Sequence, residues 1–178
     1  MDNKIINEKT KLLIFVPSIS VSEHLRNSIH GFQILQNSYL SIIYQLVDPY
    51  LHLLYISPIR LSTEEILYIE NLLLNLGINI CYKGGKRLHF ITPENVRRLP
   101  PNIDLSQALY YTSAGIRKIK NLIKKYPNVF FVPISFSVRE KNICNLFSIP
   151  SLSGDLSVSH AISSRSFIKK VCYTATAE

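Results

Sequence analysis

The 178-residue sequence has few cysteines, and their positions suit neither cross-linking nor metal binding. Cys81, Cys144 and Cys172 are odd in number and far apart, which excludes a disulfide framework and a C-x-x-C metal site. Cys81, in a predicted strand, and Cys144, in a predicted helix, are expected to be small core residues. The five histidines form no H-x-x-x-H or H-E-x-x-H pair, so we expect no metal site.

A long hydrophobic segment is also absent. No run of about 18 apolar residues occurs, so no segment is predicted to span a membrane. Residues 1–10 alternate charges and asparagines and contain no hydrophobic signal core. We therefore expect a cytoplasmic protein with reduced thiols. With 47% apolar and 18% charged residues, the chain has enough apolar material for a substantial core.

The glycine and serine motifs of common catalytic and nucleotide sites are missing as well. The first predicted strand is followed by Ser18-Ile19-Ser20-Val21-Ser22, without the glycines of G-x-G-x-x-G, which disfavours a nicotinamide or flavin role. We expect these serines to cap the next helix. Gly84-Gly85-Lys86 is too short for a phosphate-binding loop, and no G-x-S-x-G elbow is present. A standalone enzyme is disfavoured because no paired acid, base or nucleophile is visible, with the sheet-end serines and Arg165 as the only candidates.

Short continuous apolar segments alternate along the chain with helical patterns. Strands are predicted at residues 11–17, 51–57, 78–82, 88–92, 129–133 and 149–152. Helices are predicted at residues 31–47, 62–76, 105–111, 114–126 and 137–147, with a last helix from Ser157 or Ser163 to Val171. Continuous apolar strands are typical of parallel sheets buried on both faces. The fold class is therefore α/β, with a mostly parallel, Rossmann-like sheet and helices on both faces.

The net charge of +8 comes from one central stretch, the basic segment of residues 83–125. This segment has ten basic and two acidic side chains, whereas residues 1–82 have five and seven. A field of this sign attracts RNA, acidic lipids or acidic protein surfaces, but the same charges also suit a solvated helix face near a negative helix end. Phe90, Tyr110 and Tyr111 are the nearby aromatic residues for stacking on bases. The ten basic residues are Lys83, Lys86, Arg87, Arg97, Arg98, Arg117, Lys118, Lys120, Lys124 and Lys125.

Three segments carry a resemblance to a known family. Residues 12–20 (LLIFVPSIS), 111–124 (YTSAGIRKIKNLIK) and 149–171 (IPSLSGDLSVSHAISSRSFIKKV) resemble the N-terminal part of ATP-grasp-type proteins, closest to the IQ motif-containing protein H group. In that family a Rossmann-like pre-ATP-grasp domain precedes an ATP-grasp ligase module, and a small, polar and basic stretch marks the junction. The resemblance places Ser164, Arg165 and Ser166 at that junction, as candidate cofactor-binding residues.

The resemblance also has limits that bear on activity. Phe167 stands where the family has a glycine, which puts that contact in doubt. The nucleotide-holding lysines and magnesium-binding acids of the family would lie beyond Glu178, so ATP and Mg²⁺ are implied only for a longer parent. An I-Q-x-x-x-R-G motif for calmodulin is absent from this sequence.

Together these observations predict a division of the chain and a function. Residues 1–10 are expected to be a flexible N-terminus, 11–160 a pre-ATP-grasp domain, and 161–178 the start of a truncated following module. The expected function is a non-catalytic scaffold, whose partner is a downstream ATP-grasp module resembling carboxylate–amine ligases. The alternative is a basic module that binds RNA or acidic proteins through the basic segment.

Overall fold

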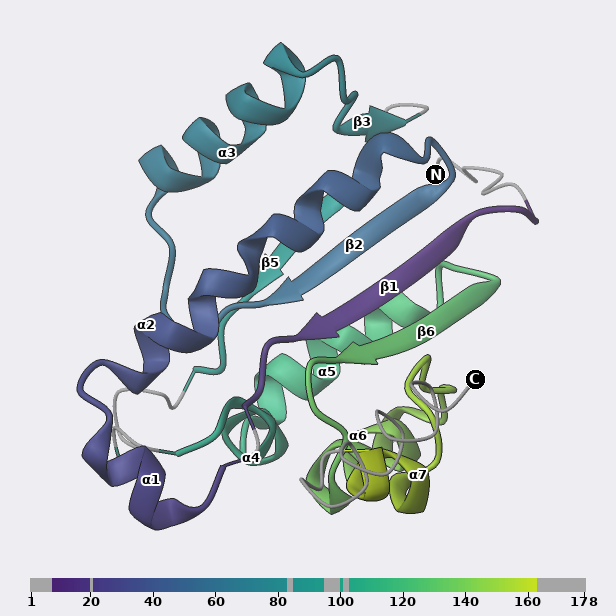
Figure 1. Cartoon of the computed structure of the whole chain (residues 1–178). Coiled ribbons are helices and arrows are strands. Elements are labelled where there is room, and N and C mark those ends of the chain that lie inside the picture. Colours follow the sequence, from purple (N-terminus) through teal and green to yellow (C-terminus); the bar gives the residue numbers. More distant parts are fainter. Residues whose placement is uncertain (1–7, 20, 83–84, 95–99, 101–102, 163–178) are drawn as a thin grey trace, which may run out of the picture.

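A computed structural model of the chain describes residues 8–19, 21–82, 85–94, 100 and 103–162 (Figure 1). Its centre is a parallel sheet with the strand order β5-β2-β1-β6. The predicted α/β class with a Rossmann-like parallel sheet is confirmed. The strands are β1 (Lys11–Val16), β2 (Leu51–Ile56), β5 (Leu88–Ile91) and β6 (Asn128–Pro133).

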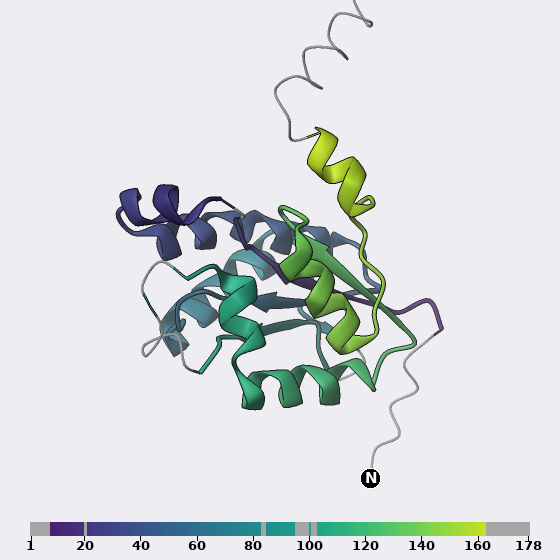
Figure 2. The same cartoon turned by 90° about the horizontal axis from the view of Figure 1, so that it is seen from below.

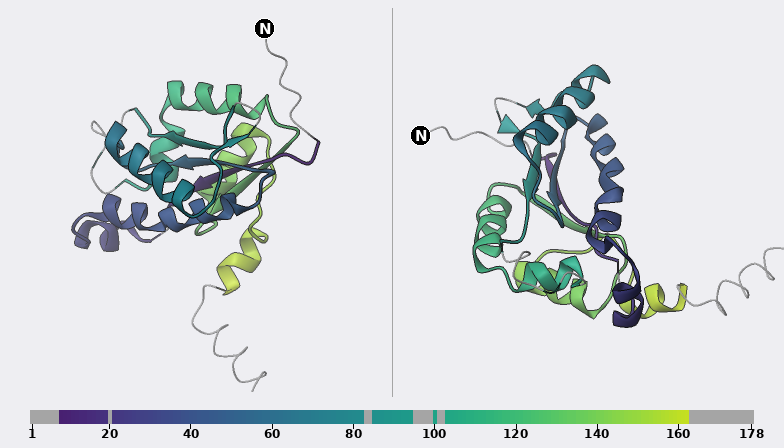
Figure 3. Two further views of the ribbon diagram at one scale, coloured as in Figure 1. Left: turned by 90° about the horizontal axis from the view of Figure 1, so that it is seen from above. Right: turned by 90° about the vertical axis from the view of Figure 1, so that its left-hand side faces the viewer.

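Helices cover both faces of this sheet, as Figures 1 and 3 show. One face packs on η1, a 3₁₀ helix (Ser38–Val47), and on α3 (Thr63–Asn75), through a core that includes Phe15, Leu53 and Tyr55. The opposite face packs on α5 (Ser113–Ile123) and on the other helices of its layer, through a core that includes Leu12, Ile14 and Phe131. Those helices are α4 (Leu105–Tyr110) and α6 (Val138–Phe147).

The remaining short elements lie at the margins. α1 (Glu23–Ser28) and α2 (Phe32–Asn37) follow β1, and α1 lies beyond the carboxyl ends of the strands (Figure 1). β3 (Cys81–Tyr82) and β4 (Gly85–Lys86) pair antiparallel, apart from the main sheet. α7 (Leu156–Ile162) projects from the body of the domain (Figure 2).

Local sequence signals explain several helix ends. Ser62 and Glu65 form the capping box of α3: the Ser62 N–H donates to Glu65 Oε2 at 2.7 Å, and the Glu65 N–H donates to Ser62 Oγ at 3.1 Å. Gly77 follows the helix at φ = 75°, in the left-handed region that favours glycine. Ser22 caps α1 by accepting from the Leu25 N–H at 3.4 Å, which confirms capping by a serine of the Ser18–Ser22 stretch.

Other predictions need correction. The helix predicted at 31–47 changes from α2 to a 3₁₀ helix near Tyr39, whose φ and ψ of −81° and 19° are not helical. The strand predicted at 78–82 shrinks to β3, and because β3 lies outside the main sheet, Cys81 is exposed and not a core residue. Cys144 is buried as predicted. At 149–152, the described chain pairs parallel with β6 through a bridge between Phe131 and Ser151.

Two predicted regions lie outside the description. α7 agrees with the predicted start of the last helix at Ser157, but the rest of that helix, from residue 163 to Val171, lies outside the described residues. The module proposed at 161–178 lies almost entirely outside them. Most of the N-terminal stretch 1–10 does so too. None of the described helices has the length and apolar character needed to cross a membrane.

Candidate functional site

The carboxyl ends of β1 and β6 are the first place to look for a site. The chain runs from β1 through β2 to β5 on one side, and then returns to place β6 on the other side of β1. In open parallel sheets this reversal opens a crevice outside the strand ends, where ligands commonly bind. The Ser135 hydroxyl, just after β6, donates to the Ser18 carbonyl oxygen, just after β1, at 3.2 Å. The two strand ends are therefore joined at the switch point.

A buried charge cluster lies beside this point and links α1 to α4 and α6. Asp104 is fully buried at the N-terminus of α4, and its Oδ2 accepts from Arg26 Nη1 at 3.0 Å and from Arg139 Nη1. Its other oxygen, Oδ1, accepts from the Gln107 N–H at 2.8 Å, so Asp104 also caps α4. Arg26 belongs to α1 and Arg139 to α6, and Figure 1 shows both helices near α4 beyond the strand ends. Both Asp104 oxygens are thus used within the fold.

The second buried acid of this region, Glu140, also accepts hydrogen bonds from the fold on both of its oxygens. Glu140 is fully buried in α6, and its Oε1 accepts from the Ser106 hydroxyl at 2.5 Å. Its Oε2 accepts from the Ser137 N–H at 2.9 Å and from the Ser137 hydroxyl, which completes a capping box. A carboxylate that accepts on both oxygens from structural donors has little capacity left as a general base. The geometry gives Glu140 a structural role.

Three polar groups near the cluster remain without a described partner. They are Ser18 Oγ, Arg26 Nε and Gln36 Nε2, all buried. Gln36 Oε1, in contrast, accepts from the Leu105 N–H at 3.2 Å, which holds α2 against α4. Buried groups of this kind commonly bind an ordered water. They supply neither a nucleophile with a base nor a metal-ligand set.

The structure divides the basic segment into residues with different roles. Arg87 does not belong to a binding patch, because its side chain is 3% exposed and donates to the carbonyl oxygens of Leu51 at 3.0 Å, of Leu46 at 2.8 Å, and of Asn79 and Asp48. The prediction that Arg87 belongs to the basic patch is therefore wrong. Its guanidinium connects the turn between η1 and β2 to the start of β5. Lys83, Arg97 and Arg98 lie outside the described residues.

The other cations of the basic segment lie on the surface. Lys86 pairs with Glu70 at 3.1 Å, and Lys118 pairs with Glu94 at 3.3 Å. The two lysine side chains stay 62% and 67% exposed in these pairs, and pairs at the surface contribute little to stability. The exposed cations of α5 and its C-terminal end are Arg117, Lys118, Lys120, Lys124 and Lys125.

The aromatic candidates for base stacking are only partly suited to it. Tyr110 and Tyr111 are both more than half exposed and form an edge-to-face pair with ring centroids 6.0 Å apart. Phe90 packs edge-on against Tyr55 at 5.9 Å and belongs to the core beneath α3. A continuous stacking platform between the cations is therefore missing from the described residues.

The junction residues of the family resemblance cannot be placed. Ser164, Arg165 and Ser166 lie outside the described residues, as does Phe167. Among the residues that are described, no three His, Cys, Asp or Glu side chains gather as a metal site would require.

His52 is a buried histidine with a structural partner. Its Nδ1 lies 2.9 Å from the Tyr126 hydroxyl, and the two rings meet edge-on at 5.1 Å. Burial, reinforced by the charge of Arg87, lowers the pKa of His52 to about 4, and burial raises the pKa of Tyr126 to about 12. Both groups are neutral at pH 7, which fits a structural pair.

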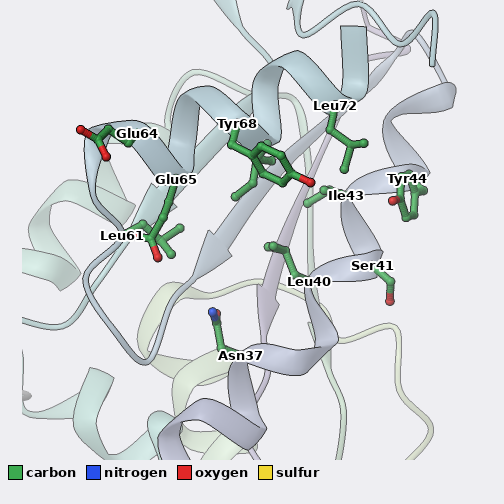
Figure 4. Close-up of a pocket in the computed structure, with 11 residues that line it drawn as sticks. Asn37, Leu40, Ser41, Ile43, Tyr44, Leu61, Glu64, Glu65, Tyr68 and Leu72 are labelled. Atoms are coloured by element: carbon green, nitrogen blue, oxygen red, sulfur yellow. The ribbon is translucent and has the colours of Figure 1, made fainter. Parts of the chain in front are cut away.

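An open apolar groove lies on the other face, between η1 and α3, and sequence reasoning missed it. Figure 4 shows Leu40 and Ile43 of η1 facing Tyr68 and Leu72 of α3 across this η1–α3 groove, which has a volume of about 530 Å³. Tyr68 is 70% exposed. Glu64 and Glu65 line the groove at the first turn of α3. Exposed apolar surface of this kind makes the groove a candidate interaction surface.

Comparisons with known proteins give one curated relative. The chain is 26% identical over 183 aligned residues to IQ motif-containing protein H of Danio rerio, covering 97% of this chain and 17% of that protein. This chain is a distant homologue of that protein. No family model matches the chain, and no solved structure does. The resemblance to the IQ motif-containing protein H group is supported, whereas the ATP-grasp part of it stays a prediction.

Proposed function

We propose that this chain is a non-catalytic, pre-ATP-grasp-like scaffold that supports a downstream module of a longer parent protein. The downstream module would be the ATP-grasp part that resembles carboxylate–amine ligases, and any ATP and Mg²⁺ would bind there. The η1–α3 groove is the single observation that carries this proposal, because it offers the described domain an uncovered apolar surface for packing.

ATP and Mg²⁺ do not fit the described residues themselves. Asp104 and Glu140, the buried acids at the strand ends, each accept on both oxygens from groups of the fold. Glu64 and Glu65 belong to a helix start, and Ser62 holds Glu65 in the capping box. The strand-end loop after β1 contains no glycine to bring backbone N–H groups close to a phosphate. We derive no chemical step through either group.

The comparison supports a longer parent in a simple way. The chain spans only 17% of the length of the curated relative that it matches, while 97% of the chain takes part in the match. The matched region is therefore a small part of the relative, whereas it is nearly all of this chain. Packing against another part would bury the exposed rings of Tyr68 and Tyr44, which are 70% and 43% exposed here. Aromatic side chains of this size dominate the energetics of interfaces.

The first test is the transcript sequence beyond the codon for Glu178. The proposal expects an open reading frame that encodes a lysine-bearing strand and, later, a glutamate and asparagine pair. A transcript that terminates at Glu178 would refute the proposal.

The second test measures binding of residues 1–178 to that downstream polypeptide by calorimetry and thermal shift. Wild type is expected to bind and to gain thermal stability. Tyr68→Asp places a charge in the groove and is expected to weaken binding about 10-fold or more, equivalent to about 1.4 kcal/mol. The matched control is Leu67→Asp, on the same helix at a 51% exposed position that does not line the groove. Equal binding by both variants, or no binding by wild type, would remove the groove as the docking surface.

A further inference from the structure

β5 ends the sheet on the side away from β6, and its outer edge is open in the described structure. Among the described strands, β5 pairs with β2 alone, where the Leu53 N–H donates to the Arg87 carbonyl at 2.7 Å and the Ser57 N–H donates to the Ile91 carbonyl at 2.8 Å. Because alternate residues of a parallel strand face its partner, the backbone groups of Leu88 and Phe90 point away from β2. This β5 edge is a template for one more strand.

A furrow follows this edge along its length. Two adjoining hollows of about 300 Å³ and 830 Å³ share Ile66, Phe90 and Lys118 in their linings. The right-hand view of Figure 3 faces this side of the molecule, with α3 in dark teal above and α5 in green at the left. Because both helices stand beside the strand, the space between them suits a single extended chain.

The two walls of the furrow differ in chemistry. On the α3 side, Ile66 is apolar, and Glu70 pairs with Lys86, whose side chain is 62% exposed. Arg60 adds a further cation to the lining of the larger hollow. On the α5 side, Lys118 lines both hollows, and its pairing with Glu94 joins two exposed side chains.

The α5 wall of the furrow is formed by Lys118 and Leu122, and the furrow floor is neutral. The other cations of α5 and its C-terminal end are exposed nearby but do not line the two hollows: Arg117, Lys120, Lys124 and Lys125. The floor residue His89 has a pKa below its ordinary value because it is buried, so it adds no charge at pH 7.

Successive side chains of an added strand point alternately to the two sheet faces. Those on one face would meet Ile66 of α3, and those on the other would meet Lys118 of α5. We propose that the β5 edge binds an extended peptide segment of a partner protein whose side chains alternate between apolar and acidic. The backbone of Leu88 and Phe90 would supply the pairing, and Lys118 the selectivity for acidic side chains.

Two other occupants fit less well. A second copy paired edge to edge through β5 would bring the basic α5 of one chain toward that of the other, and like charges oppose such pairing. RNA would find Lys118, but Phe90 is the one Phe, Tyr or Trp side chain in the described lining, and it packs against Tyr55 in the core beneath α3.

The test uses residues 1–178 and three probes of fixed chemistry. They are a pool of nine-residue peptides alternating Val or Leu with Glu or Asp, the same pool with Lys in the acidic positions, and a twelve-nucleotide oligouridine. Binding is followed by NMR shifts of backbone amides and by hydrogen exchange. The acidic pool is expected to bind and to slow exchange of the Leu88 and Phe90 amides about 10-fold or more, while the basic pool does not bind.

Two charge-reversal variants test whether the α5 side of the furrow selects acidic peptides. Lys118→Glu is expected to weaken binding of the acidic pool about 10-fold, whereas Lys141→Glu, on an exposed position of α6, leaves it unchanged. The proposal is overturned by equal binding of the basic pool, by no binding of the acidic pool at millimolar concentration, or by binding without protection at Leu88 and Phe90. Oligouridine that binds more tightly than the acidic pool would assign the face to nucleic acid. Slowed exchange at β5 that grows with protein concentration, without peptide, would assign it to a second copy.

Discussion

Asp104→Asn tests most sharply whether the charge cluster at the strand ends is structural. Asparagine keeps the size of the side chain and still caps a helix, so the substitution removes mainly the charge. The side chain of Asp104 is fully buried, and those of its partners Arg26 and Arg139 are 7% and 44% exposed. Water can reach Arg139 after the change, but the Arg26 guanidinium is left charged and buried.

The magnitude follows from that difference in exposure. Removing one partner of a buried ion pair costs about 3–5 kcal/mol, and the lower end applies because only Arg26 is stranded. With a urea m-value of about 2 kcal/mol/M, a loss of about 3 kcal/mol lowers the unfolding midpoint by about 1.5 M. The control Glu94→Gln breaks the exposed pair with Lys118, whose side chains are 46% and 67% exposed. It should cost less than about 1 kcal/mol.

The assay is urea unfolding followed by circular dichroism for wild type and both variants. A midpoint for Asp104→Asn as high as that of Glu94→Gln would refute the reasoning. Such a result would mean that Arg26 does not depend on Asp104, and the acid would return to consideration as a functional group of the switch point.

Two further predictions concern titration and reactivity. Because the folded-state pKa of His52 is about 4 and its unfolded value about 6.5, the unfolded chain binds the extra proton between these values, so stability falls as the pH falls through this window. The loss should reach up to about 2 kcal/mol between pH 6.5 and 5 in urea titrations, and should be clearly smaller in His52→Gln; an equal loss in both proteins would contradict the assignment. Burial raises the pKa of the Cys144 thiol to about 11, whereas Cys81 is exposed, so in a Cys172→Ser background iodoacetamide at pH 8 should modify only Cys81 until urea unfolds the chain. Rapid native-state labelling of Cys144, read by mass spectrometry, would show that its helix does not shield it.

Much of the fold could be predicted because its signals are local. The apolar runs of β1 and β2 end close to a proline, which predicts where each strand stops. The capping box of Ser62 and Glu65 predicts where α3 begins. The change from α2 to η1 near Tyr39 could not be read in the same way, since α- and 3₁₀-helical residues share similar apolar spacing. The strand predicted at 78–82 is longer than the observed β3, because a short apolar run does not reveal whether it joins the main sheet.

The candidate sites were harder to predict because they depend on contacts between distant residues. The bond between Arg26 and Asp104 spans 78 positions, and no local pattern connects them. One signal was available: Ser137 and Glu140 repeat the capping-box spacing seen at Ser62. The η1–α3 groove had none, because an apolar stripe on a helix does not tell how much of it stays uncovered.

The claim that this domain performs no nucleotide chemistry by itself is tested most directly by ATP turnover. Purified residues 1–178 are incubated with ATP and Mg²⁺, with and without a pool of carboxylate and amine acceptors, and release of phosphate is followed. The account predicts phosphate release no faster than in a blank without protein. Steady turnover that co-purifies with the chain, and that scales with its concentration, would contradict it.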